Sequence, residues 1–278
     1  MIAVSGLRFR YAGTAQDALQ GLDLSIGEGE LVGVAGANGS GKSTLCYALT
    51  GYVPHFFSGA LQGLVSVAGH DVTRTPVSLL AADIGLVFHN PFNQISGART
   101  TVLEEVAFGL ENLGIEQAML RPRSMQALRA TGLDDLADRS PYTLSGGEQQ
   151  RLAIAAVMAM LPKVLVLDEP TSQLDPAGTR AIFQVLRRLA RDSRTTIVLT
   201  EHKLGWLAAF VDRLTVLHSG RVVADGPPRD VLAEAAEQPW GVGATRYTRA
   251  AQAARKQGQL AARTPLPVTL EQALEVLR

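Results

Sequence analysis

The chain has 278 residues, with 26 Lys and Arg against 26 Asp and Glu, so its formal net charge is zero. The length excludes a peptide hormone or a disulfide miniprotein, and the charge balance gives no basis for a dedicated nucleic-acid-binding protein. The single cysteine, Cys46, cannot form an internal disulfide, which favours a cytosolic setting.

The first residues predict two strands and then a strand, a loop and a helix. Apolar residues nearly alternate over 2–11 and again over 22–26 after a turn at Gly21. An unbroken apolar run at 31–35 is typical of a buried parallel strand, and residues 42–49 favour a helix.

A stretch without Asp, Glu, Lys or Arg, residues 43–70, is long enough to be tested as a membrane span. Glycine, proline, histidine and glutamine interrupt it repeatedly, so we expect a helix, a turn and a strand of a water-soluble protein. The first ten residues lack the basic-then-apolar order of a signal peptide. Any membrane association is therefore expected to come through a partner.

Later segments predict an α/β fold. Short apolar strands are expected at 84–88, 164–167, 195–200 and 214–217, with helical segments between several of them. From Thr101 to Gln150 the apolar residues Val102, Val106 and Leu110 recur at helical spacing, which indicates an inserted helical subdomain.

These patterns divide the chain into a core, a helical subdomain and a C-terminal extension. We expect a core at 1–89 and 161–225 with an antiparallel N-terminal part and a mainly parallel sheet, a helical subdomain at 90–160, and a C-terminal helical extension at 226–278. The extension begins with Gly-Pro-Pro, which marks a boundary. Its residues 238–270 hold five basic and no acidic side chains; a solvated helix face is the favoured interpretation, and an anionic partner is the alternative.

The segment Gly36-Ala37-Asn38-Gly39-Ser40-Gly41-Lys42-Ser43 has the pattern of a glycine-rich phosphate loop, between a predicted strand and a predicted helix. Glycines let backbone amides face phosphate oxygens, and the helix N-terminus offers unpaired N–H groups. Lys42 is expected to neutralise β/γ charge, and Ser43 to reach Mg²⁺. A tight turn without a ligand would leave the Lys-Ser pair unexplained. The expected phosphate-binding residues are Asn38, Gly39, Ser40, Gly41, Lys42, Ser43 and Thr44.

Two carboxylates, Asp168 and Glu169, end the predicted buried strand at 164–167. Ligands of open α/β sheets collect at the carboxyl ends of the strands, so Asp168 is expected to hold the water shell of Mg²⁺. Adjacent strand residues face different ways, which leaves Glu169 to polarise an attacking water as general base. The alternative, a solvated acidic turn, conflicts with Pro170 and the apolar lead-in.

A second glycine pair, in Leu144-Ser145-Gly146-Gly147-Glu148-Gln149-Gln150-Arg151, opens a helix expected at 148–160 and makes another anion-binding terminus. This stretch, the signature segment (residues 144–151), resembles the signature motif of ATP-binding cassette (ABC) ATPases. The resemblance covers roughly residues 1 to 230 and implies a P-loop NTPase fold with ATP and Mg²⁺ as cofactors. It also implies that Ser145, Gly146 and Gly147 of one subunit cap the γ-phosphate held by the other.

Three further residues fall where this family places functional groups. Tyr11 is similar to the aromatic that stacks on adenine, Asp175 to the acid of the D-loop between paired sites, and His202 to the catalytic switch histidine. Taken alone, Tyr11 is an ordinary strand aromatic and His202 an ordinary polar strand end. Asp175 could also cap the helix that begins at Pro176.

A narrower resemblance rests on the segments 90–94, 104–109 and 153–160, which look like ATPases of energy-coupling factor (ECF) transporters. It implies a peripheral protein on the cytoplasmic face of the cell membrane, paired with an identical or related ABC ATPase. The implied partners are an integral coupling subunit and a substrate-binding membrane protein for a vitamin or metal ion, with no nucleic acid. The surface near residues 92–99 is expected to meet them. In this subfamily another polypeptide selects the substrate.

One position departs from the family pattern. His89 stands where the family has a glutamine that contacts Mg²⁺ and its water and relays contact with the membrane subunit. A neutral imidazole can accept the same hydrogen bond, so we expect His89 to serve as a catalytic and metal-facing residue.

Two other functions stay open at this point. A soluble ABC clamp for DNA repair or translation usually carries a long coiled-coil insertion or two tandem cassettes, and this chain has neither. A nucleotide-binding regulatory half with reduced hydrolysis would follow if His89 impairs catalysis.

Overall fold

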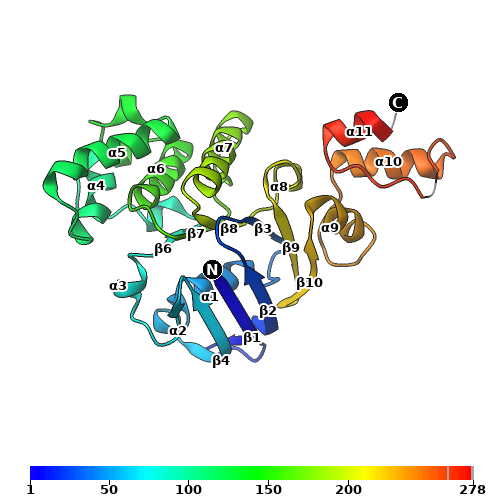
Figure 1. Ribbon diagram of the computed structural model, residues 1–278, viewed down its shortest axis with the longest axis horizontal. Coiled ribbons are helices and arrows are strands. Elements are labelled where there is room, and N and C mark those ends of the chain that lie inside the picture. Colours follow the sequence, from blue (N-terminus) through cyan, green and yellow to red (C-terminus); the bar gives the residue numbers. More distant parts are fainter. Residues whose placement is uncertain (262, 277–278) are drawn as a thin grey trace.

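The computed structural model describes residues 1–261 and 263–276 of the chain. It contains two sheets, a helical subdomain beside them and a helical extension at the C-terminal end (Figure 1). The expected α/β fold class, with an antiparallel first part, a mainly parallel second sheet, an inserted helical region and a C-terminal helical region, is confirmed.

The smaller sheet is antiparallel, in the order β2-β1-β4-β5. Its strands are β1 (Ile2–Tyr11), β2 (Leu19–Ile26), β4 (Gly59–Val67) and β5 (His70–Asp71). Along β1 the side chains of Ile2, Val4, Leu7 and Phe9 are buried on one face, as the alternating sequence predicts. This face packs against α1 (Lys42–Leu49) and the larger sheet.

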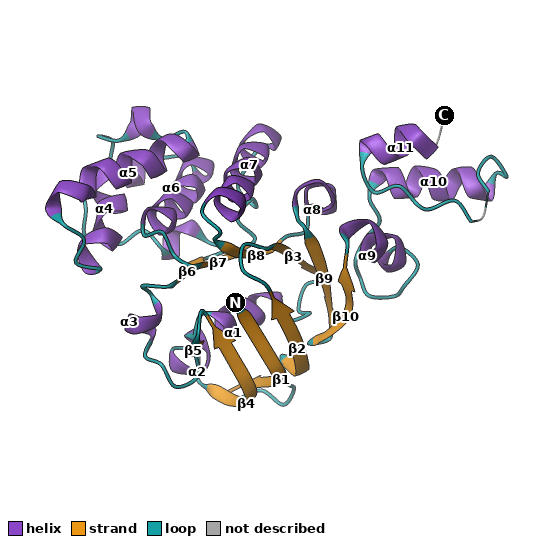
Figure 2. Cartoon of the chain, in the orientation of Figure 1, coloured by secondary structure: helices purple, strands orange, loops and turns teal. Residues whose placement is uncertain are grey.

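The larger sheet has the order β10-β9-β3-β8-β7-β6 and lies above the smaller one in Figure 2. Its strands are β3 (Leu31–Gly36), β6 (Ile84–Val87), β7 (Val164–Asp168), β8 (Thr196–Thr200), β9 (Arg213–His218) and β10 (Arg221–Gly226). Only β10 runs antiparallel to its neighbour. Every residue of β3, β6, β7 and β8 is buried, because helices or the smaller sheet cover both faces.

The remaining core elements connect these strands. They are α2 (Tyr52–His55), α3 (Val77–Leu80), α7 (Pro176–Asp192) and α8 (Leu204–Phe210). The strand at the end of the core, β10, is an element that the sequence reading did not predict.

The helical subdomain has its own apolar core, formed by α4 (Val102–Asn112), α5 (Gln117–Thr131) and α6 (Gly146–Ala159). Three short 3₁₀ helices, Pro91–Asn93, Asp134–Leu136 and Pro141–Thr143, lie in its connections. Val102, Val106 and Leu110 are fully buried on one face of α4, as their spacing predicts. The expected helix at 148–160 begins two residues earlier, because Ser145 caps it.

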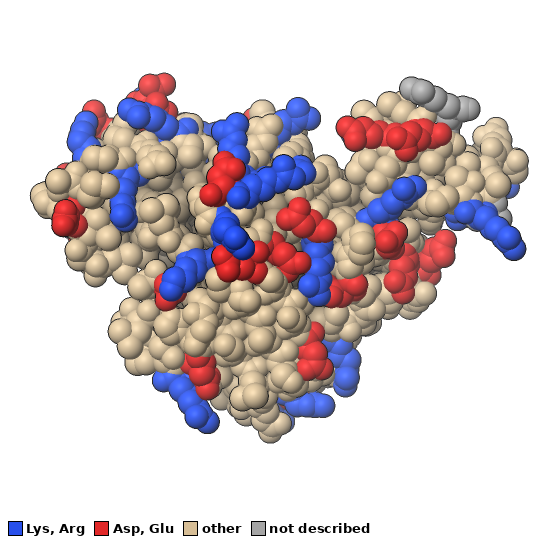
Figure 3. Space-filling view, viewed as in Figure 1, with Lys and Arg blue, Asp and Glu red and all other residues tan. Residues whose placement is uncertain are grey.

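The extension contains α9 (Pro228–Ala235), α10 (Arg246–Lys256) and α11 (Leu270–Val276). Val231, Leu232 and Ala235 of α9 are buried in the core cluster that also holds β3 and α7, whereas α10 packs mainly on α11. On the face in Figure 3, acidic and basic side chains are interspersed over the helical parts. Within residues 1–261 and 263–276, no helix has both the length and the apolar character needed to cross a bilayer.

Candidate functional site

The phosphate loop, residues 36–43, joins the buried strand β3 to α1 and is tightly enclosed by backbone. Gly41 has a φ of +105°, and a Cβ there would lie 2.7 Å from the carbonyl oxygen of Ala18. Gly220 also donates its N–H to the carbonyl of Ser40 at 2.9 Å. The loop conformation is therefore fixed by the fold, and only glycine fits at position 41.

The N-terminus of α1 is open to a ligand. Its N-cap is Gly41, and no side chain caps the first turn. Ser40 is only 4% exposed, and in the part of the chain that the structure describes its hydroxyl oxygen has no hydrogen-bond partner. A buried hydroxyl without a partner beside free helix N–H groups fits the oxygen atoms of a phosphate group.

Lys42 lies folded over the same loop. Its Nζ donates to the carbonyl oxygens of Gly36 at 3.0 Å and Ala37 at 3.1 Å. Burial lowers the pKa of Lys42, while the nearby charges of Glu169 and Asp168 act in the opposite direction. A bound polyphosphate would give this buried ammonium group a stronger partner than two carbonyls.

Asp168 ends β7 and is 1% exposed. Its Oδ1 accepts a hydrogen bond from the Thr200 hydroxyl at 2.8 Å, which fixes the carboxylate at the carboxyl edge of the sheet. Among the described residues, no three His, Cys, Asp or Glu side chains gather to hold a metal ion. Asp168 offers one carboxylate, and Ser43 in the first turn of α1 offers one hydroxyl. This donor set suits Mg²⁺ when waters and substrate phosphates complete the shell.

Glu169 lies between two histidines. Its Oε1 accepts a hydrogen bond from His202 Nε2 at 2.9 Å, and its Oε2 lies 3.2 Å from His89 Nδ1. The three residues follow the ends of β8, β7 and β6, which are neighbours in the larger sheet. Glu169 itself adopts a φ of +50°, and its N–H donates to the Thr200 hydroxyl at 2.9 Å. The carboxylate of the expected general base is therefore oriented by the hydrogen bond from His202, and the His89 ring lies beside its other oxygen.

His89, the residue that departs from the family pattern, lies beside Glu169. Sequence reasoning placed His89 toward the metal, and that role stays a prediction. The structure brings its ring to the carboxylate that is expected to activate water, and leaves the side chain 52% exposed at the mouth of the site.

Hydrogen bonds from residues that the sequence did not single out connect the segment around His202 to the segment after β7. The Thr171 hydroxyl donates to Glu201, whose other oxygen accepts the N–H of His202 at 2.8 Å. Lys203 Nζ donates to the carbonyls of Thr171 at 2.8 Å and Leu174 at 3.3 Å. Glu201 is 3% exposed, so a buried charge with full hydrogen bonding ties the residues after β8 to those after β7. Nothing in the sequence distinguishes these side chains from surface charges.

Tyr11 stands beside the first turn of α1. Its hydroxyl lies 3.1 Å from the Thr44 Oγ1, and its ring meets Phe9 edge-on with a centroid distance of 4.8 Å. Phe57 lies on another side with a centroid distance of 6.5 Å. The stacking of adenine on Tyr11 stays a prediction, and the position of Tyr11 next to the phosphate loop is compatible with it.

The signature segment lies at the N-terminus of α6. The Ser145 hydroxyl bonds Glu148 Oε2 at 2.8 Å, and the same Glu148 oxygen accepts the Ser145 N–H at 2.7 Å. A Cβ on Gly147 would lie 3.2 Å from the carbonyl of Gln173, so the segment packs on residues 172–175. Asp175 caps α7 by accepting the Gly178 N–H at 2.7 Å, as the alternative interpretation expected.

The single chain does not join its two anion-binding helix ends. No hydrogen bond that the structure describes connects Ser145, Gly146 or Gly147 to residues 36–44.

Comparison with known proteins gives a consistent result. A family model described as ABC transporter matches residues 19–172. An ABC transporter ATP-binding protein of Pyrococcus horikoshii is 45% identical over 232 residues, which cover 84% of this chain and 81% of that protein. A protein of the same description from Streptomyces avermitilis is 39% identical over 98% of this chain, and the match spans 46% of its length.

Two solved structures share the fold. The structure of cbiO1 from Clostridium perfringens, part of the ABC transporter complex cbiONQ, has a TM-score of 0.73 and 33% identity, covering 84% of this chain and 91% of that one. A dimeric ATP-binding cassette, MJ0796, in a post-hydrolysis state bound to ADP and Pi has a TM-score of 0.73 and 28% identity, covering 82% and 99%.

Proposed function

The chain belongs to the ABC transporter family of ATP-binding, ATP-hydrolysing proteins, and we propose that it is the ATPase subunit of an ECF-type importer for a vitamin or metal ion. ABC ATPases act as dimers and work with membrane components. The observation that carries the finer proposal is the 33% identity to cbiO1, part of the complex cbiONQ, over 84% of this chain.

The phosphate loop binds ATP in this proposal. The free N–H groups of α1, the Ser40 hydroxyl and Lys42 take the phosphates, and Tyr11 meets the base. Ser43 and Asp168 would hold Mg²⁺, which when bound neutralises charge on the β- and γ-phosphates. Lys42 exchanges two carbonyl partners for phosphate oxygens, so the negative charge of ATP offsets the desolvation that lowers the pKa of this side chain.

Hydrolysis depends on Glu169. Its carboxylate, held by His202 and standing beside His89, orients a water and takes its proton as the water attacks. The charge that develops on the transferred phosphoryl group is shared by Lys42 and by the signature segment of the second subunit, which contributes Ser145, Gly146 and Gly147. Asp175 lies between the two sites. Catalysis is therefore mainly positioning and electrostatics.

We propose that the loop at residues 92–99 is the contact with the membrane subunit, on the cytoplasmic face of the membrane. Phe92 is 58% exposed on a short 3₁₀ helix that Asn90 caps. The buried Glu105 accepts the N–H of Ser96 at 2.6 Å and its hydroxyl at 2.8 Å, so the loop is anchored at its start by the Asn90 cap and at its middle by Ser96. A fixed loop with an exposed aromatic is suited to dock into an integral partner.

The test is extraction of the chain from its native membrane in mild detergent, followed by identification of the integral proteins that co-purify. We expect a coupling subunit and a small substrate-binding membrane protein. Phe92→Asp should lose these partners and the ATPase stimulation they give, by about tenfold or more, as expected for an aromatic anchor.

The matched control is Leu64→Asp, because Leu64 is a 67% exposed apolar residue on β4 of the smaller sheet. It should keep the membrane partners. Co-purification with DNA or ribosomes and with no integral membrane protein would overturn the importer proposal and favour a soluble clamp.

A further inference from the structure

The segment that links α9 to α10 contacts the phosphate loop. In this linker segment (residues 240–242), Gly241 has a φ of +71°, and a Cβ built there would lie 2.8 Å from the Cβ of Ala37. Real Cβ atoms essentially never approach so closely, so the backbone of the linker segment lies directly on the loop side chain with no room between them.

The linker segment is held on both sides of this contact. His218 Nδ1, at the end of β9, donates to the carbonyl oxygen of Trp240 at 3.1 Å. Val242 is 8% exposed and lies in the core cluster that includes Leu31 and Ala35 of β3. Both neighbours of Gly241 are anchored, Trp240 to β9 and Val242 to the core around β3. The linker segment therefore cannot move outward to relieve the clash between a side chain at position 241 and Ala37.

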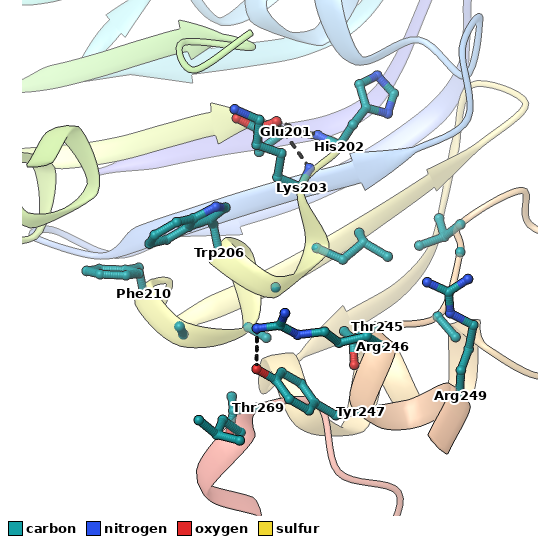
Figure 4. A pocket seen from close by; sticks show the side chains of 18 of the residues that line it. Glu201, His202, Lys203, Trp206, Phe210, Thr245, Arg246, Tyr247, Arg249 and Thr269 are labelled. Atoms are coloured by element: carbon teal, nitrogen blue, oxygen red, sulfur yellow. Dashed lines mark hydrogen bonds between the residues drawn. The ribbon is translucent and has the colours of Figure 1, made fainter. Parts of the chain in front are cut away.

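A cavity of about 1450 Å³ lies beside this contact and separates α8 from α10 and α11. Figure 4 shows Trp206 and Phe210 of α8 on one side of it and Arg246, Tyr247 and Thr269 of the extension on the other. Gly36 and Gly241 line the same cavity. The helices α8 and α10 line this cavity, whereas the linker segment contacts the phosphate loop directly through Gly241.

We propose that Gly241 is a positioning residue for ATP binding. The linker segment holds Ala37 and thereby keeps the amides of residues 38–41 in the conformation that receives phosphates. The inference rests on the proposal that the phosphate loop binds ATP, and it goes beyond it by assigning the C-terminal extension a role in that binding.

The experiment compares steady-state ATPase kinetics and ATP binding by calorimetry for Gly241→Ala and for two controls in the same extension. Gly258 has the same φ of +71° with nothing within 4 Å of a Cβ, so Gly258→Ala reports backbone strain alone. Gly243→Ala reports the added methyl group in open space, because nothing lies within 4 Å there either.

We expect Gly241→Ala to raise the KM for ATP by about fivefold or more with kcat changed by less than about twofold, the pattern of lost substrate binding. Both controls should match the wild type. Removing the opposing methyl group with Ala37→Gly in the Gly241→Ala background should recover most of the affinity, measured against Ala37→Gly alone. A KM for Gly241→Ala equal to that of Gly258→Ala, or no recovery in the double variant, would overturn the inference.

A second variant keeps the test decisive if Gly241→Ala does not fold. His218→Ala removes the hydrogen bond to Trp240 and should raise the KM for ATP in the same direction, by about two- to threefold; a KM equal to that of the wild type would contradict the inference. Failure of the underlying assignment gives a different result. If Lys42→Ala binds ATP as tightly as the wild type, the phosphate loop itself has been misassigned.

Discussion

The two helices that begin at glycine-rich turns, α1 and α6, differ at their N-termini. At α1 the N-cap is Gly41 and no side chain satisfies the first-turn N–H groups. At α6 the N-cap is Ser145, and Ser145 and Glu148 form a complete capping box. The first-turn N–H groups are therefore available to a ligand at α1, whereas at α6 the chain's own side chains form the cap.

The capping of α6 is a way for a shared nucleotide site to avoid binding phosphate in a single chain. Backbone and side-chain hydrogen bonds from Ser145 lower the pKa of Glu148, so a carboxylate already occupies the N-terminus of α6. A phosphate at this end has to compete with that charge. In the proposed dimer, the second chain would bring the nucleotide to this end together with its own Lys42, whose charge favours the phosphate.

The largest expected effect tests whether the two helix ends meet around one ATP. Glu169→Gln should lower kcat by about 10² or more, the scale of losing a positioned general base, and the variant should accumulate as an ATP-bound dimer. Steady-state kinetics and size-exclusion chromatography with ATP measure both. Adding Ser145→Arg should abolish the dimer and leave nucleotide binding intact. Wild-type turnover in Glu169→Gln would contradict the role of Glu169.

The second prediction compares the open and the closed end within a single chain. Lys42→Ala should weaken ATP affinity by about tenfold or more, because charge-assisted hydrogen bonds to phosphate are lost. Ser145→Ala should change the same affinity by less than about twofold, since its helix end is internally capped. Calorimetry at concentrations below dimer formation gives both values. Equal losses in the two variants would show that a single chain uses both ends.

The third prediction mixes the two defects. Lys42→Ala and Ser145→Arg chains should each be inactive, and an equal mixture should recover at most about half of wild-type activity, because a mixed dimer has one intact composite site where a wild-type dimer has two. The recovered rate should depend on protein concentration. No recovery at concentrations where mixed dimers are demonstrated would refute site sharing.

The smallest effect concerns the cap itself. The pKa of Glu148 is lowered in the folded chain, so Glu148 contributes stability above its usual pKa, and that contribution is lost as the pH falls through the folded value. Glu148→Gln should cost about 0.5 kcal/mol at pH 7 and less at pH 3, where the contribution of the carboxylate is being lost. Urea unfolding at both pH values measures the difference. Glu116→Gln, at an exposed position before α5 that makes no cap hydrogen bond, is the reference.

Local pattern was enough to predict much of the fold. The apolar run 31–35, the glycines of the phosphate loop and the helix 42–49 are contiguous, so their conformation follows from propensity and turn chemistry. The start of α6 was misplaced by two residues because a capping box needs Ser145 outside the helix and Gly146 inside it. Strand β10 escaped prediction since its residues are only half-buried and lack a clear alternation.

The residue types of the site could be predicted from short segments of the chain: a phosphate loop, a carboxylate pair after a buried strand, a glycine pair before a helix, and a histidine at position 89. Each of these features lies within a few consecutive residues. Tertiary structure alone decided that Glu169 lies between His89 and His202, that Lys203 ties the segments after β7 and β8 together, and that Gly241 rests on Ala37. The reason is that these contacts depend on the order β9-β3-β8-β7-β6, which places the ends of strands distant in sequence side by side.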